Sequence, residues 1–143
     1  MTRDPVNVPA SIAGRLRNIA HKKQTNAQLL LRRYAIERLL YRLSLSRHRD
    51  RFILKGAMLF AVWLDDPFRP TQDLDLLGFG ENTAAALAET FREICRQEVE
   101  ADGLLFDAEN LTAAPIRRDH DYGGGSWDPG VRSSLFAFNA RLW

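Results

Sequence analysis

Residues 69–77 read RPTQDLDLL, an apolar run that contains two acids one residue apart. This run predicts a buried strand over 71–77. Because successive side chains of a strand point to opposite faces, Asp73 and Asp75 should share one face with Thr71. Two like charges on a buried strand are costly unless a cation lies between them. The stretch therefore predicts a cation site.

The chemistry of two carboxylates aimed at one point indicates which cation. Such oxygens are ligands for a hard divalent ion such as Mg²⁺, which favours sites completed by substrate phosphates. A pair of these ions can activate an attacking hydroxyl and hold a triphosphate in line for displacement. Asp73 and Asp75 are therefore candidate catalytic and metal-binding residues. Asp-x-Asp alone also occurs on solvated faces, so the pair indicates a catalytic site only together with the segments around it.

The segment before these acids has the composition of a phosphate-binding turn. Residues 51–55 read RFILK and predict a buried strand, and Gly56 lets the backbone approach a phosphate closely. A helix beginning at Ala57 would point free N–H groups at that phosphate. Lys55 and Arg69 would add positive charge at the edges of the pocket, although each could be an ordinary surface residue. The candidate nucleotide-binding residues are Lys55, Gly56, Ala57, Arg69 and Thr71.

Two helices are predicted ahead of these strands. The first covers about 9–21 with Ser11 as its cap, and the second covers about 26–45. Apolar residues of the second helix form two stripes, so it should pack on two sides, with Arg38 and Arg42 pointing outward between them. The stripes are Leu29, Ile36, Leu40 and Leu43, and Leu30, Tyr34, Tyr41 and Leu45.

A further helix is predicted over about 83–98, after a short one over 57–64. Its buried face should carry Leu87, Phe91, Ile94 and the lone cysteine, Cys95, which we expect to be inert packing. Further strands are predicted at 104–106, at 116–120 and within the final SLFAFNARLW, and Asp102-Gly103 should form a turn. The fold class is α+β: a small mixed sheet with flanking helices, preceded by two N-terminal helices. The order strand, glycine, helix, strand with inward acids is what a nucleotidyltransferase of the DNA polymerase β type needs.

Composition and charge limit the possible functions. The chain has 143 residues, 45% of them hydrophobic and 27% charged, which is typical of one globular domain. No apolar run approaches a membrane span, and the first residues lack a signal-peptide core, so we expect a cytoplasmic protein. Residues 1–51 contain twelve Lys or Arg and three acids, which gives a net charge of +9. The remaining residues contain eight Lys or Arg and fifteen acids, which gives a net charge of −7. A basic first segment suits an anionic partner such as RNA, or is simply the solvated face of two helices.

RFILKGAMLFAVW followed by RPTQDLDLLGFG closely resembles the AbiEii/AbiGii toxin family. This family comprises nucleotidyltransferase-like proteins of bacterial abortive-infection and toxin–antitoxin systems, and the resemblance covers roughly residues 10–124. By resemblance, Gly56-Ala57 matches the motif that holds nucleotide phosphates, although family members often have glycine or serine in place of Ala57. Asp73 and Asp75 match the paired metal-binding aspartates.

The resemblance also implies substrates and partners. It implies a nucleoside triphosphate, GTP in some members, as the donor, and an RNA hydroxyl, in some cases that of tRNA, or a protein hydroxyl as the acceptor. It further implies Mg²⁺ as cofactor and a cognate antitoxin as partner. The residues divide into a basic helical segment, 1–50, a partial nucleotidyltransferase core, 51–122, and a tail, 123–143, that departs from the family pattern.

The tail is where the pattern ends. GSWDPGV intervenes where the family continues into strands, which a shifted reading frame or a truncation would explain. No counterpart of the family's third carboxylate is identified, and Asp107, Asp119, Asp121 and Asp128 are candidates by charge alone. Three hypotheses therefore stay open: an active nucleotidyltransferase toxin, an inactive remnant of such an enzyme, or a nucleotide- or partner-binding module.

Overall fold

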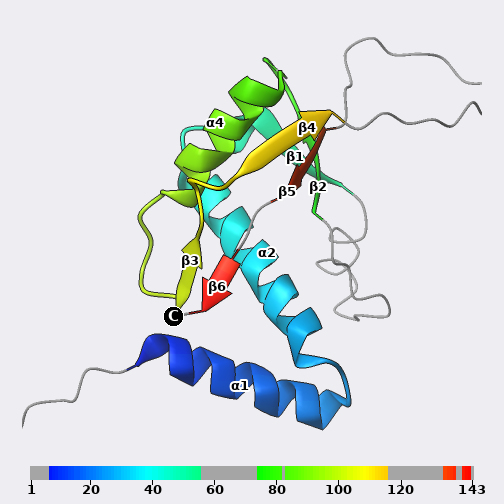
Figure 1. Ribbon diagram of the computed structural model, residues 1–143, viewed down its shortest axis with the longest axis vertical. Coiled ribbons are helices and arrows are strands. Elements are labelled where there is room, and N and C mark those ends of the chain that lie inside the picture. Colours follow the sequence, from blue (N-terminus) through cyan, green and yellow to red (C-terminus); the bar gives the residue numbers. More distant parts are fainter. Residues whose placement is uncertain (1–6, 56–73, 82, 116–133, 138–139, 143) are drawn as a thin grey trace, which may run out of the picture.

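The computed structural model describes residues 7–55, 74–81, 83–115, 134–137 and 140–142. It contains helices and short strands in an order that confirms the α+β class (Figure 1). The helices are α1 (Val8–Lys23), α2 (Ala27–Leu45), the one-turn 3-10 helix η1 (Arg49–Arg51) and α4 (Ala84–Cys95). The strands are β1 (Phe52–Lys55), β2 (Asp75–Gly78), β3 (Leu104–Phe106), β4 (Thr112–Pro115), β5 (Ser134–Ala137) and β6 (Ala140–Leu142).

Side-chain caps define the helix starts. The Asn7 carboxamide accepts a hydrogen bond from the Ala10 N–H at 3.1 Å, so α1 begins earlier than the predicted cap at Ser11. Asn26 caps α2 in the same way through the Gln28 N–H, and Thr83 caps α4. None of the described helices is long and apolar enough to cross a membrane.

The described strands form three antiparallel pairs, β1 with β2, β3 with β6 and β4 with β5. The sequence predicted a mixed sheet, but every strand pair among the described residues is antiparallel. The registers of the last two pairs are nested, since Leu104 pairs with Leu142 and Thr112 with Ala137. Residues 104–115 therefore run antiparallel to 134–137 and 140–142, and we call these paired segments the ribbon. The predicted strand at 116–120 and helix at 57–64 lie outside the described residues.

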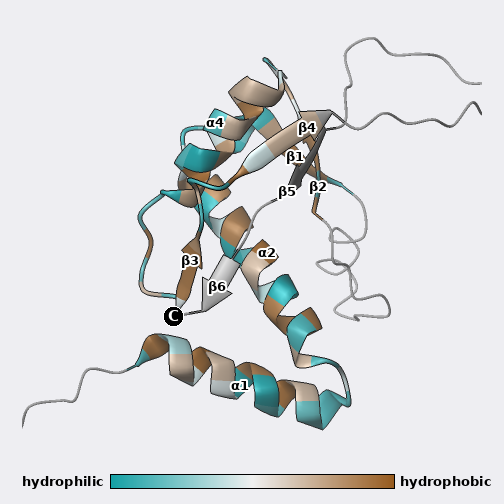
Figure 2. Cartoon of the chain, in the orientation of Figure 1, coloured by the Kyte–Doolittle hydropathy of each residue, from teal (hydrophilic) through white to brown (hydrophobic). Residues whose placement is uncertain are grey.

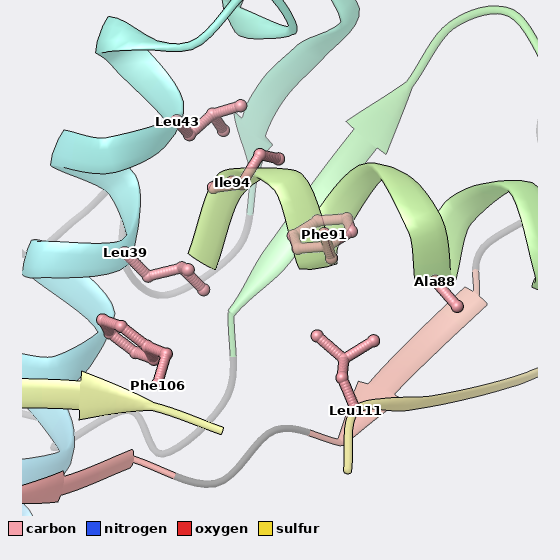
Figure 3. Close-up of a cluster of buried hydrophobic side chains, with 7 residues drawn as sticks. All are labelled: Leu39, Leu43, Ala88, Phe91, Ile94, Phe106 and Leu111. Atoms are coloured by element: carbon pink, nitrogen blue, oxygen red, sulfur yellow. The ribbon is translucent and has the colours of Figure 1, made fainter. Parts of the chain in front are cut away.

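The hydrophobic core lies between α2, α4 and the β3–β4 side of the ribbon (Figure 3). Leu39, Ile94 and Leu111 are its fully buried members. The predicted face of α4 is confirmed, because Leu87, Phe91 and Ile94 are buried and Cys95 packs against the same cluster. Burial raises the pKa of the Cys95 thiol to about 11, which keeps it protonated.

The two stripes predicted for α2 are only partly correct. Ile36 and Leu43 are buried as expected, but Tyr41 and Leu45 are exposed. Leu39, which belonged to neither stripe, is the most buried residue of the helix. Hence α2 buries one broad face, centred on Leu39 and Leu43, rather than two.

Candidate functional site

Two of the seven predicted site residues, Lys55 and Asp75, lie in the part of the chain that the structure describes. The antiparallel register of β1 and β2 places Lys55 directly opposite Asp75, next to the Leu54–Leu76 pair. The ladder therefore brings a basic and an acidic side chain to the same face of one strand pair. The other predicted residues, Gly56, Ala57, Arg69, Thr71 and Asp73, lie outside the described residues.

The β1–β2 pair has one face against the core and one toward solvent. Leu74 and Leu76 pack against the buried cluster, whereas Asp75 is exposed. This alternation confirms the predicted division of faces over 74–76. The prediction that both strands are buried is wrong for this part of the ladder, because Ile53 is 52% exposed and Lys55 is also exposed. An exposed Asp75 needs no cation to offset burial, but its carboxylate is open to a ligand from solvent.

The Asp75 carboxylate has the oxygen chemistry that Mg²⁺ prefers, but a metal site needs further ligands. Within the described ranges, no group of three or more His, Cys, Asp or Glu residues is placed to hold a metal ion. Asp75 therefore supplies one candidate ligand beside a lysine. A lysine at the opposite ladder position would suit an anionic group bound at this edge.

Arg51 holds the loop that follows β2, a role that the sequence analysis missed. Its carbonyl accepts a hydrogen bond from the Phe79 N–H at 2.8 Å. Its guanidinium donates to the carbonyls of Phe79 and Glu81 and to the Thr90 hydroxyl, at 3.2, 3.1 and 3.3 Å. Gly80 completes this loop with a φ of +90°, which a side chain would strain. The strand that carries Asp75 is thus fixed at its C-terminal end.

A buried ion-pair network joins α2 to the turn before β3. Arg42 donates two hydrogen bonds to the Asp102 carboxylate, at 2.7 and 3.2 Å, and Arg38 donates another at 2.7 Å. The same carboxylate accepts the Leu104 N–H at 3.1 Å. Burial alone would raise the pKa of Asp102, but the hydrogen bonds from Arg42 and Arg38 outweigh it and lower that pKa.

This network corrects the prediction that Arg38 and Arg42 point outward. Arg42 is only 5% exposed, and its guanidinium lies 4.8 Å from the centre of the Phe106 ring. A buried arginine is tolerated here because Asp102 offsets its charge. The partner lies 60 residues away, so helical spacing could not reveal it.

A second charged cluster lies where α2 ends and η1 begins. The buried His48 ring contacts the Glu93 carboxylate on α4 at 2.8 Å, and Arg47 donates two hydrogen bonds to that carboxylate at 3.0 and 2.8 Å. Hydrogen bonds from His48 and Arg47 lower the pKa of Glu93. These contacts fix the connection that leads into β1, and therefore support the ladder rather than form a separate site.

Comparison with known proteins gives one match. A family model described as the nucleotidyl transferase AbiEii toxin of type IV toxin–antitoxin systems matches residues 38–134. The matched region begins within α2 and includes all seven predicted site residues. No curated protein and no solved structure matches the chain.

Proposed function

Because the chain belongs to the AbiEii nucleotidyl transferase toxin family of type IV toxin–antitoxin systems, we propose that it transfers a nucleoside monophosphate from a nucleoside triphosphate to a hydroxyl of RNA. tRNA is the first acceptor to test, and GTP is among the donors to test. The bond that breaks joins the α- and β-phosphates, so pyrophosphate leaves as the RNA hydroxyl forms a new phosphodiester and loses its proton.

One observation supports the proposal most directly: Lys55 and Asp75 face each other on the open side of the β1–β2 ladder. A lysine at this position suits the phosphates of a triphosphate. An exposed carboxylate beside it suits a divalent metal that those phosphates also bind. Both residues are predicted site residues, and Arg51 holds the loop at the end of the same ladder.

We assign roles to the remaining predicted residues by the same chemistry. Asp73 would join Asp75 as a Mg²⁺ ligand, and Gly56, Ala57, Arg69 and Thr71 would contact the nucleotide. When bound, Mg²⁺ would supply charge stabilisation for the phosphates and lower the pKa of the attacking hydroxyl. Nucleotidyltransferases in general use a divalent metal; Mg²⁺ is our specific choice.

The proposed reaction also implies a location and a partner. Nucleoside triphosphates and tRNA are cytoplasmic, so we place the protein there. Membership of a type IV toxin–antitoxin family implies an antitoxin, and the antitoxin would limit the reaction in the cell.

The test incubates the full chain with each labelled triphosphate, Mg²⁺ and total tRNA. Wild type should label the RNA and EDTA should abolish labelling, while Asp75→Asn should reduce it by at least about 100-fold, the scale of lost metal or transition-state stabilisation. Asp50→Asn is the matched control, because it removes one exposed acid outside the ladder. Equal labelling by wild type and Asp75→Asn would overturn the assignment of Asp75.

A further inference from the structure

The N-terminal part of the described chain is rich in basic residues. We call residues 7–36 the basic arm; it comprises α1 and the first half of α2. The arm contains six Lys or Arg and no Asp or Glu. Figure 2 shows hydrophilic residues, in teal, alternating with apolar ones, in brown, along α1. No acid within the arm offsets this charge, although Glu37, the next residue, forms an ion pair with Arg33.

The basic residues of α1 lie away from the core. Ala20 is buried and Leu16 half-buried, so they mark the inner side of α1, which packs against α2 and β6. With 3.6 residues per turn, Arg15 and Lys22 fall on the opposite side of the helix, beside Asn18. The exposed basic residues of α1 are Arg15, Arg17, His21, Lys22 and Lys23. Arg15 and Lys22 form no ion pair with another described residue.

Contacts with the core fix the orientation of this surface. Gly103, in the turn before β3, lies so close to Pro9 and Ile12 of α1 that an added Cβ would stand 3.0 Å from each. Tyr34 of the arm donates a hydrogen bond of 2.8 Å to the Asp102 carbonyl. The start of α1 therefore lies against the turn before β3, and α2 is joined to the same turn, which holds the two helices of the arm in place.

From these observations we infer that the basic arm binds the phosphate backbone of an RNA acceptor. Lys, Arg, Asn and Gln side chains are the usual contacts to phosphate and sugar, and the arm exposes four amides, Asn18, Gln24, Asn26 and Gln28, among its cations. The core of a protein interface is typically depleted of charged residues, whereas the exposed side of α1 is basic and carries one large apolar residue, Ile19. This inference rests on the proposed function for the identity of the acceptor.

The position of the arm indicates the size of the acceptor. The nineteen residues of α2 span about 28 Å at 1.5 Å per residue, and they separate α1 from η1 and β1. Figure 1 shows α1 at one end of the molecule and the β1–β2 pair beyond the far half of α2. A nucleotide or trinucleotide cannot contact both places. A folded RNA of tRNA size can, so the arm should act on large acceptors only.

The test measures binding of fluorescently labelled tRNA to the full chain over a range of salt concentrations, without triphosphate. Arg15→Gln/Lys22→Gln should weaken binding and make the plot of log Kd against log salt shallower by about 2, about 1 for each lost phosphate contact. Arg49→Gln/Arg96→Gln is the control, because it removes the same charge from two exposed arginines outside the arm. Its slope should stay near that of wild type.

The outcomes separate this inference from the proposed function. Three results would each overturn RNA binding by the arm. The salt slope could be the same in Arg15→Gln/Lys22→Gln as in wild type, or it could fall equally in the control variant. Poly-glutamate could also compete with labelled tRNA for wild type as well as unlabelled tRNA does at the same charge concentration. Asp75→Asn should bind tRNA as wild type does while losing transfer. If wild type transfers no nucleotide but still binds tRNA through the arm, the proposed reaction is overturned and RNA binding by the arm is supported.

Discussion

Removal of the Asp102 carboxylate should be among the most destabilising single changes in the described part of the protein. Asp102→Ala leaves Arg42, which is 5% exposed, as a buried charge without its bidentate partner. It also removes the acceptor for Arg38 and for the Leu104 N–H. Breaking a buried pair from one side costs about 3–5 kcal/mol of unfolding free energy. For a chain near this length, that corresponds to a fall in Tm of about 6–20 °C.

Urea unfolding followed by far-UV circular dichroism measures this cost, because α2 and α4 are both part of the affected core. Glu37→Ala is the matched control: it breaks an exposed ion pair with Arg33 on the same helix and should cost less than about 1 kcal/mol. Asp102→Asn keeps the shape and an oxygen for Leu104, so it should fold and lie between the two. If Asp102→Ala costs no more than Glu37→Ala, the network does not stabilise the fold as argued.

Three further predictions concern stability and reactivity. The pKa of Asp102 is lower in the folded protein than in the unfolded chain, so its contribution to the unfolding free energy is complete above its unfolded pKa of about 3.9 and is lost as pH falls through the lower folded value. Urea unfolding should therefore show a smaller loss of stability at acid pH in Asp102→Asn than in wild type. Equal losses in the two proteins would contradict this prediction. Gly80→Ala should cost about 1–2 kcal/mol because of its φ of +90°, whereas Gly14→Ala, in open space on α1, should stabilise by about 0.5–1 kcal/mol; urea unfolding giving both the same sign would refute the backbone argument. Cys95, with its pKa of about 11, should react with iodoacetamide at pH 8 much more slowly in the native protein than in urea, and equal rates would show that it is not packed in the core.

Local patterns predicted those features whose partners are near in the chain. The 3.6-residue spacing of Leu87, Phe91 and Ile94 was sufficient for α4, and two-residue alternation placed Asp75 on the face opposite Leu74 and Leu76. Both signals depend only on neighbours in sequence. The start of α1 was misplaced because two polar residues, Asn7 and Ser11, could each cap it, and only the observed hydrogen bond distinguishes them.

Features that depend on distant partners were missed. Arg42 is buried because Asp102 is its counterion. The pairing of β3 with β6 and of β4 with β5 follows from a register that no local pattern carries. The same limit applies to the site. The sequence predicted Lys55 and Asp75 as site residues, but their direct pairing follows from the antiparallel register of β1 and β2.

The most direct measurement of the central claim is the mass of a purified tRNA before and after incubation with the full chain, Mg²⁺ and one triphosphate at a time. Nucleotidyl transfer predicts that, with at least one triphosphate, the RNA gains the mass of one or more nucleoside monophosphates while an equal amount of pyrophosphate appears. It also predicts that Asp75→Asn, folded by circular dichroism, gives no gain. An unchanged RNA mass with all four triphosphates and folded wild-type protein would contradict the proposed reaction.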